Sequence, residues 1–197
     1  MITCTFAGHR EVFGSCTQKI ENALETLIEN EDTLYCYVGG MGEFDGFSAA
    51  AVRNLKRKYP NKEIRLTLVL PYMQQKLNEY KEYYETSFDD ILIPAELAEI
   101  HYKRAIPARN RWLVDNSDYL IAMVWRDFGG AYTTLRYAQK QGKKIILLER
   151  KKRGRGAGNR HPRPCFVKAH SSSVRVKTVS ENALSVMACS LFTAAAA

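Results

Sequence analysis

Residues 118–136 read DYLIAMVWRDFGGAYTTLR, and this stretch decides the fold of the chain. Its first part, residues 120–125, is a short and almost unbroken apolar run, which is typical of a strand covered on both faces. Gly129 and Gly130 follow as a turn, and residues 131–141 have helical periodicity up to Gly142. The stretch therefore predicts a buried strand, a glycine-bearing turn and the first turn of a helix.

Short β-rich segments alternate with helical ones through the rest of the first 149 residues. The expected strands are 2–7, 34–38, 64–70, 90–94, 120–125 and 144–148. The expected helices are 17–31, 44–59, 74–85, a helix that ends at 105–107, and then 108–116 and 131–141. Such alternation predicts an α/β fold with a parallel sheet of five to six strands and helices on both faces.

The charge of the chain is concentrated in its last part. Of the net charge of +8, residues 150–197 contribute +9 (ten Lys or Arg against one Glu), so residues 1–149 carry −1. We therefore expect a folded domain at 1–149 and a basic extension at 150–197 that is flexible or only partly docked. Within that extension, residues 174–179 alternate like a strand, and residues 182–192 are apolar enough for a docked helix.

Cysteine usage and hydropathy indicate the compartment. The five cysteines lie at scattered positions, without a C-x-x-C pair, which favours a reducing cytosol and no metal site. Met1 leads straight into an expected strand, so we expect no signal peptide. No apolar run approaches about 18 residues, and we expect no membrane partner.

Three of the expected strands end in turns that contain glycine. The turns are Gly8-His9-Arg10, Gly39-Gly40-Met41-Gly42 and Gly129-Gly130. Glycine lets the backbone take a positive φ and lets a ligand approach closely. Because the carboxyl ends of parallel strands lie at one edge of a sheet, where ligands bind, we expect the three turns to form one ligand site.

An anion is the expected ligand of that site. The first N–H groups of the helix after the last turn have no partner within the helix and attract groups such as phosphate. Thr133 adds a hydroxyl just inside this helix, and Arg109 follows Pro107, which we take to mark the start of helix 108–116. Arginine, a threonine hydroxyl and a helix start together fit a phosphate or phosphoribosyl group. Pairing of Arg109 with a carboxylate such as Asp115, or exposure to solvent, is the alternative.

Several of these residues also have an ordinary structural explanation. His9 is equally compatible with a turn residue satisfied by backbone groups, and Arg10 with a surface charge. Trp125 and Phe44 are candidate surfaces for stacking a base, although such residues more often belong to the core. Glu43 and Asp45, beside the second turn, are candidate catalytic carboxylates or solvated acidic residues.

Four segments of the chain match one family pattern in order. They are Thr5-Phe6-Ala7-Gly8-His9-Arg10, Gly39-Gly40-Met41-Gly42, residues 109–118 (RNRWLVDNSD) and residues 129–133 (GGAYT). Together they resemble the SLOG superfamily, and within it the YpsA-like branch of small bacterial proteins, over residues 1–148. The resemblance implies a Rossmann-like fold that binds nucleotides or nucleotide derivatives at these turns. The superfamily includes the DNA-processing protein DprA, the Lonely Guy (LOG) phosphoribohydrolases and sensor domains of bacterial defence systems.

The chain matches the LOG pattern only in part. LOG enzymes carry a Pro-Gly-Gly-x-Gly-Thr-x-x-Glu segment, in which the glutamate and an upstream arginine support N-glycosidic hydrolysis. Gly129, Gly130 and Thr133 match this pattern, but the glutamate position is Arg136. The carboxylate that supports an oxocarbenium-like state is therefore missing at that position, which argues against hydrolysis of this type.

Three functions follow from these observations. The leading hypothesis is a cytosolic protein that binds a nucleotide or nucleotide derivative and requires no other cofactor. A sensor is the role that we expect for such a protein. One alternative is an N-glycoside hydrolase of nucleoside monophosphates in which Glu43, Asp45 and Arg109 are the catalytic candidates. The other is a nucleic-acid-binding module that uses the basic residues of 150–177. The tyrosine-rich segment 74–85 is a candidate contact surface for a homodimer.

Overall fold

The structure, a computed structural model, describes residues 1–12, 14–149 and 175–177. Its elements, in chain order, are β1 (Ile2–Gly8), α1 (Thr17–Ile28), β2 (Thr33–Val38), α2 (Glu43–Lys58), β3 (Glu63–Val69), α3 (Lys76–Glu79), α4 (Lys81–Ser87), β4 (Asp90–Leu92), η1 (Ala95–Leu97), α5 (Tyr102–Asp115), β5 (Tyr119–Met123), α6 (Gly130–Lys140), β6 (Lys144–Leu147) and β7 (Arg175–Lys177). The expected helix at 182–192 lies outside the described residues.

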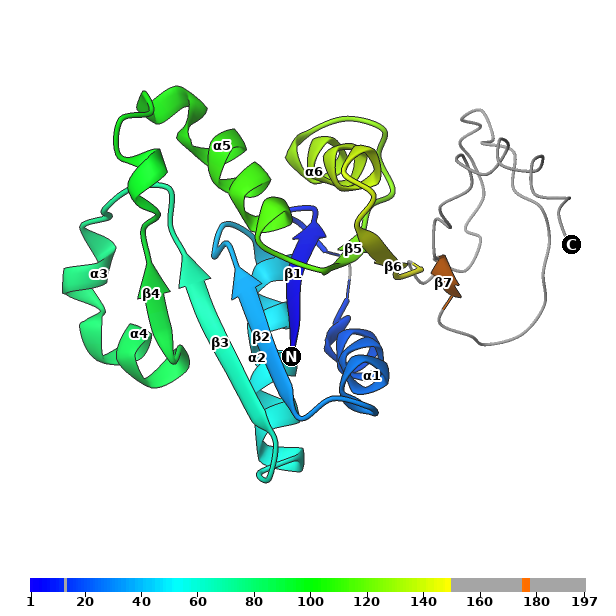
Figure 1. Ribbon diagram of the computed structural model, residues 1–197. Helices are drawn as coiled ribbons and strands as arrows, with labels where there is room; N and C mark the ends of the chain where they lie inside the picture. Colours follow the sequence, from blue (N-terminus) through cyan, green and yellow to red (C-terminus); the bar gives the residue numbers. More distant parts are fainter. Residues whose placement is uncertain (13, 150–174, 178–197) are drawn as a thin grey trace, which may run out of the picture.

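The strands form a seven-stranded sheet in the order β4-β3-β2-β1-β5-β6-β7 (Figure 1). The pairs from β4 to β6 are all parallel, and β7 pairs antiparallel with β6 within the segment whose sequence alternates like a strand. This confirms the predicted Rossmann-like α/β fold. The order reverses between β1 and β5, because the chain adds β2, β3 and β4 on one side of β1 and β5 and β6 on the other.

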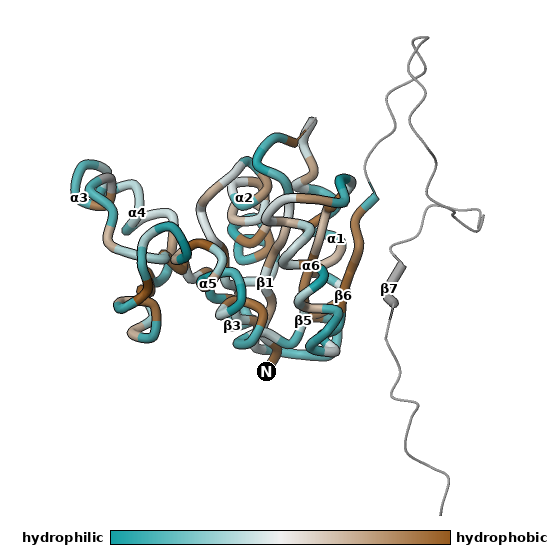
Figure 2. The backbone as a smooth tube through the Cα atoms, turned by 90° about the horizontal axis from the view of Figure 1, so that it is seen from above, coloured by the Kyte–Doolittle hydropathy of each residue, from teal (hydrophilic) through white to brown (hydrophobic). Residues whose placement is uncertain are grey.

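Helices cover both faces of the sheet because successive strand residues point to opposite sides. In β1, Phe6 belongs to the large core cluster shared with α1 and α2, whereas Ala7 belongs to a smaller cluster that contains residues of α5 and α6. The same alternation holds in β5, where Ile121 faces the first cluster and Ala122 the second. The strands are therefore almost continuously apolar, as Figure 2 shows for β5 and β6.

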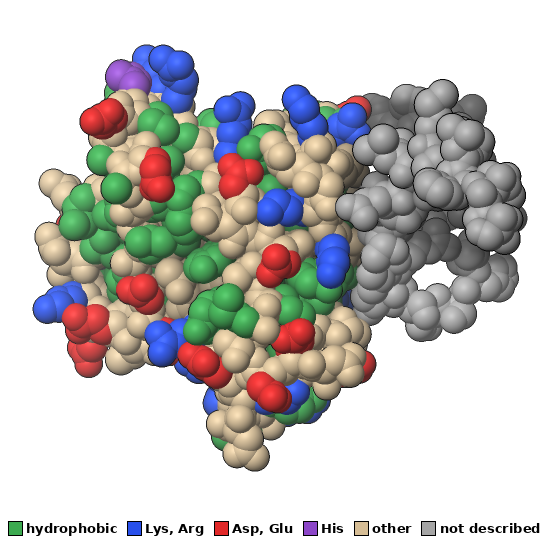
Figure 3. Space-filling model, in the orientation of Figure 1, with side chains coloured by type: hydrophobic (Ala, Val, Ile, Leu, Met, Phe, Trp, Pro, Cys, Tyr) green, Lys and Arg blue, Asp and Glu red, His purple; other side chains and the backbone are tan. Residues whose placement is uncertain are grey.

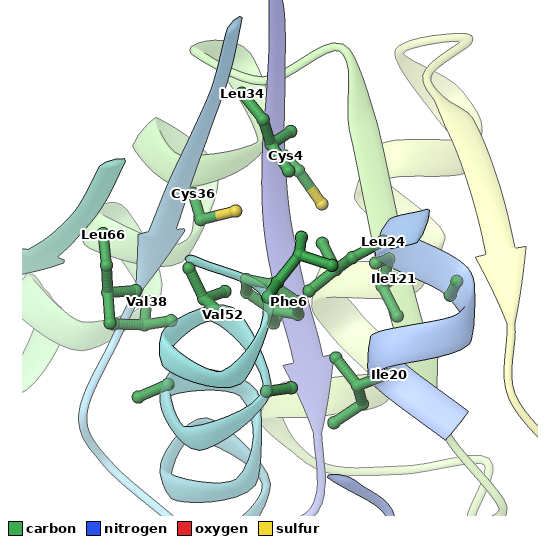
Figure 4. Packing of buried hydrophobic residues seen from close by; sticks show 14 of the residues in the cluster. Cys4, Phe6, Ile20, Leu24, Leu34, Cys36, Val38, Val52, Leu66 and Ile121 are labelled. Atoms are coloured by element: carbon green, nitrogen blue, oxygen red, sulfur yellow. The ribbon is translucent and has the colours of Figure 1, made fainter. Parts of the chain in front are cut away.

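The three cysteines of the described residues are free and buried. Cys4 and Cys36 are partners in the β1–β2 register and lie in the core between the sheet and α2 (Figure 4). Burial raises the pKa of both thiols, and it raises the pKa of Cys16 to about 11. These cysteines act as small apolar core residues.

Two helices differ from the prediction. The expected helix at 74–85 is interrupted at Tyr80, which separates α3 from α4. The two helices expected on either side of Pro107 form a single helix, α5, which begins at Tyr102, where the ring of His101 accepts a hydrogen bond from the N–H of Lys103. The helix then continues through Pro107 without one backbone hydrogen bond, so tertiary packing outweighs the preference of proline for helix starts.

Two features of the surface bear on the remaining predictions. Tyr80 and Tyr83 of the tyrosine-rich segment are more than half exposed, and the homodimer contact proposed for them stays a prediction. In the part of the chain that the structure describes, none of the helices has the length and apolar character of a membrane span.

Candidate functional site

A cleft of about 450 Å³ lies where the sheet order reverses. The connection after β1 leads to α1 on one face and the connection after β5 leads to α6 on the other, so the two chains diverge and leave a crevice. The cleft is lined by the three glycine turns and by one side of α5. Figure 3 shows Lys and Arg side chains along the upper edge of the molecule, where α5 and α6 lie in the same orientation in Figure 1.

Most of the residues expected to form a ligand site meet in this cleft. Those that line it are Gly8, His9, Arg10, Gly39, Met41, Gly42, Asp45, Arg109, Gly129 and Gly130. Gly40, Glu43 and Thr133 are not among the lining residues. Gly40 has φ +65° and faces Leu68, so its role in the described structure is to shape the turn.

Hydrogen bonds hold the first turn to the other two. The carbonyl of Arg10 accepts from the N–H of Glu43 at 2.9 Å, and the Glu43 carboxylate accepts from the N–H of Val12 at 2.7 Å. On the other side, Nε2 of His9 accepts from the N–H groups of Trp125 and Arg126 at 3.2 and 3.3 Å. Glu43, a catalytic candidate from the sequence, thus bridges two loops.

His9 is a neutral, buried histidine. Accepting two N–H groups at Nε2 places its ring proton on Nδ1. The ring packs against Trp125, with 4.1 Å between the centroids, and burial together with the charge of Arg126 lowers the pKa of His9 below its ordinary value. His9 is thus satisfied by backbone groups and also lines the cleft, and its role in ligand binding stays a prediction.

Arg109 is the most deeply buried charged side chain of the cleft, with 2% of its surface exposed. Its Nη1 donates to the carbonyl of Val69 at 3.3 Å, whereas its Nε has no hydrogen-bond partner among the described residues. A Cβ at Gly39 would lie 2.6 Å from Cζ of Arg109, so the guanidinium occupies the space that this glycine leaves free. Burial lowers the pKa of Arg109, and the charge of Asp45 opposes that shift.

The position of Arg109 corrects two expectations. Because α5 begins at Tyr102, Arg109 lies in the middle of the helix rather than in its first turns. The expected alternative, a pair between Arg109 and Asp115, is also wrong, because Asp115 accepts from the hydroxyl of Tyr137 at 2.9 Å. The exposed guanidinium of Arg111 lies 5.8 Å from the ring centroid of that same tyrosine.

Asp45 is the candidate catalytic carboxylate that the structure brings into the cleft. It lies in the first turn of α2, and its Oδ2 accepts from the N–H of Met41 at 2.8 Å. Burial raises the pKa of Asp45, and the Met41 N–H and the charge of Arg109 counteract the rise. A partly buried carboxylate next to a buried guanidinium can accept hydroxyl or amine hydrogens from a ligand.

The start of α6 forms another part of the cleft lining. Gly129 caps the helix with φ +89° and ψ 178°, and Gly130 and Ala131 line the cleft. The first helical N–H groups have no partner within the helix, as in other anion-binding helix starts. The threonine in the lining is Thr134; the hydroxyl of Thr133 is exposed and donates to the carbonyl of Gly129 at 3.0 Å. Successive residues of a helix point in different directions, so Thr133 points away from the cleft that Thr134 lines. The match to the sequence motif did not take this difference in direction into account.

Two residues of the third turn, Arg126 and Phe128, line the cleft although they were not among the predicted site residues. The side chain of Phe128 is 64% exposed. Their place between a buried strand and Gly129 was the available signal, since every residue of such a turn lies near the carboxyl edge of the sheet. Phe44, a candidate stacking surface, is instead core, with 1% exposed.

The fold is similar to that of solved DNA-processing proteins. The chain aligns with DNA processing protein A (DprA) from Streptococcus pneumoniae at a TM-score of 0.53 and 15% sequence identity, over 74% of this chain and 50% of that one. For DprA from Helicobacter pylori, described for its single-stranded DNA binding mode, the TM-score is 0.53 and the identity 19%, over 76% and 66% of the two chains. The chain thus spans between a half and two thirds of these proteins, and the likeness concerns the fold. No protein-family model and no curated protein matches the sequence.

Proposed function

We propose that this protein binds a nucleotide or nucleotide derivative in the cleft, with the anionic group of the ligand between Arg109 and the start of α6. The observation that carries the proposal is the buried guanidinium of Arg109, whose Nε lacks a partner among the described residues. A buried charge without full hydrogen bonding is costly, and because Arg109 lines the cleft, a phosphate or ribose oxygen bound there would contact the guanidinium and offset part of that cost. The free N–H groups at the start of α6 attract the same kind of group.

Charge and size support this ligand class. Arg10, Arg109 and Arg126 line the cleft against the carboxylates of Glu11 and Asp45, so cations outnumber acidic groups. The volume of about 450 Å³ lies within the range of small-molecule sites. The DprA-like fold supports a place in the SLOG superfamily. The four sequence motifs are the support for the narrower proposals, which are a place in its YpsA-like branch and a cytosolic role as a nucleotide sensor.

Thermal unfolding with added ligands tests the proposal. AMP, ADP-ribose and NAD would be compared at increasing concentration, because a ligand at 100 times its dissociation constant adds about 2.7 kcal/mol to the stability. We expect at least one to raise the melting temperature, and Arg126→Gln to weaken that ligand by about tenfold or more through loss of a charged hydrogen bond. Arg136→Gln is the matched control, because Arg136 is exposed on α6 outside the cleft. Equal losses in the two variants would reject the site.

Two observations favour further candidate functions. Asp45 in the cleft favours N-glycoside hydrolysis, which predicts release of base from AMP by the wild type and its loss in Asp45→Asn. The fold shared with DprA favours binding of nucleic acid. This function predicts an affinity for nucleic acid that falls steeply with salt concentration. If the basic segment carries the binding, truncation after Glu149 abolishes it.

A further inference from the structure

We propose that Phe128 is the stacking platform that makes the cleft selective for ligands carrying a planar base over sugar phosphates that lack one. The inference rests on the proposed function and specifies the part of the ligand that the arginines do not recognise. It starts from the exposure of Phe128, whose apolar ring is 64% exposed while lining the cleft.

The other aromatic rings near the cleft are already engaged. Phe6 and Phe44 line it but are 5% and 1% exposed, and Phe44 fills the space beside Gly8. Trp125 packs against the ring of His9. Among the described cleft residues, Phe128 therefore offers a phenyl face that a ligand can cover.

Phe128 is also close to the groups expected to hold the anion. It lies two residues before Gly130, the first residue of α6, so the two Cα atoms are at most about 7 Å apart. Arg126 lies two residues before Phe128 and lines the same cleft. A ligand whose phosphate sits at the helix start thus keeps the rest of its structure within reach of the ring.

A single exposed phenylalanine is ordinary on a protein surface. What separates Phe128 from such a residue is its position in a concave, cationic site on the turn that carries the helix start. Stacking of a base on an aromatic side chain tolerates every base, because each has a π-face. The inference therefore commits to a planar ring and not to a particular base.

Calorimetric titration with AMP and with ribose 5-phosphate separates the two parts of the ligand. We expect Phe128→Ala to weaken AMP binding by about 5- to 150-fold and to leave ribose 5-phosphate within about twofold. Phe128→Trp should retain AMP binding because it keeps a stacking ring. Tyr80→Ala is the matched control, since Tyr80 is 59% exposed and lies outside the cleft.

The outcomes distinguish this inference from the function on which it rests. If Phe128→Ala leaves AMP binding unchanged, or weakens AMP and ribose 5-phosphate equally, the stacking role is wrong and the anion site remains. If the wild type binds neither compound, the proposed function fails for mononucleotides and the inference fails with it. Melting curves of both alanine variants should match the wild type, because the two side chains are exposed.

Discussion

Gly39→Ala is expected to destabilise the protein far more than its single methyl group suggests. The added Cβ would lie 2.6 Å from Cζ of Arg109, where ordinary contact begins near 3.4 Å. The guanidinium must therefore move, and its hydrogen bond to the carbonyl of Val69 is already 3.3 Å long. Displacement toward the cleft that Arg109 lines would break that bond.

The magnitude follows from the lost hydrogen bond. The added methyl group meets the far end of the Arg109 side chain, which can move toward the cleft that it lines, so little overpacking remains. Loss of a hydrogen bond from a charged group costs about 1.5–3 kcal/mol, and we expect a loss of this size in the free energy of unfolding. That loss is a sizeable share of the roughly 5–15 kcal/mol of a typical domain.

Urea denaturation followed by circular dichroism measures this loss. Gly46→Ala is the matched control, because Gly46 lies within α2 with open space around it and alanine should stabilise the helix by about 0.5–1 kcal/mol. In an Arg109→Met background the cost of Gly39→Ala should fall, giving a coupling energy of about 0.5–3 kcal/mol. A loss below about 1 kcal/mol for Gly39→Ala, or an unchanged cost in the double variant, would refute the reasoning.

Two further perturbations test the turns that surround the cleft. Gly129→Ala should lower the free energy of unfolding, measured by urea denaturation, by about 1–3 kcal/mol, because φ +89° with ψ 178° is accessible essentially to glycine alone. An unchanged free energy of unfolding would contradict the described turn. The pKa of His9 is lowered from 6.5 in the folded state, so the unfolded state binds more protons below that pH. The stability that neutral His9 contributes is therefore complete above about pH 6.5. It is lost as the pH falls through the lowered pKa of the folded state. Urea midpoints at pH 7.5 and 5.5 should therefore differ less in His9→Gln than in the wild type, and an equal difference would exclude this role.

The fold was predictable because its signal is repeated along the chain. Each strand alternates with a helix, and the apolar runs at 34–38, 64–70 and 120–125 lie on β2, β3 and β5. A parallel sheet in turn places the ends of its strands at one edge, which is why turns more than 100 residues apart could be assigned to one site.

The individual side chains of the site were less predictable because each depends on tertiary packing. Proline is common at helix starts, and that local preference placed Arg109 in a first turn, whereas packing extends α5 back to Tyr102. Nothing in the sequence marks Arg109 as buried, because its burial depends on the empty space beside Gly39. Phe128 was missed for the opposite reason, since exposure of one residue in a turn has no periodic signature.

The glycines at the ends of β1 and β2 each leave space for a side chain from another element. Phe44 fills the space at Gly8, and Arg109 fills the space at Gly39. In related chains, a residue with a side chain at position 8 or 39 would have to be accompanied by a smaller residue at position 44 or 109. Positions 8 and 44 should therefore covary among related sequences, and so should positions 39 and 109. The glycines at positions 8 and 39 then make room for side chains of the protein itself, and their presence alone is not evidence of ligand binding.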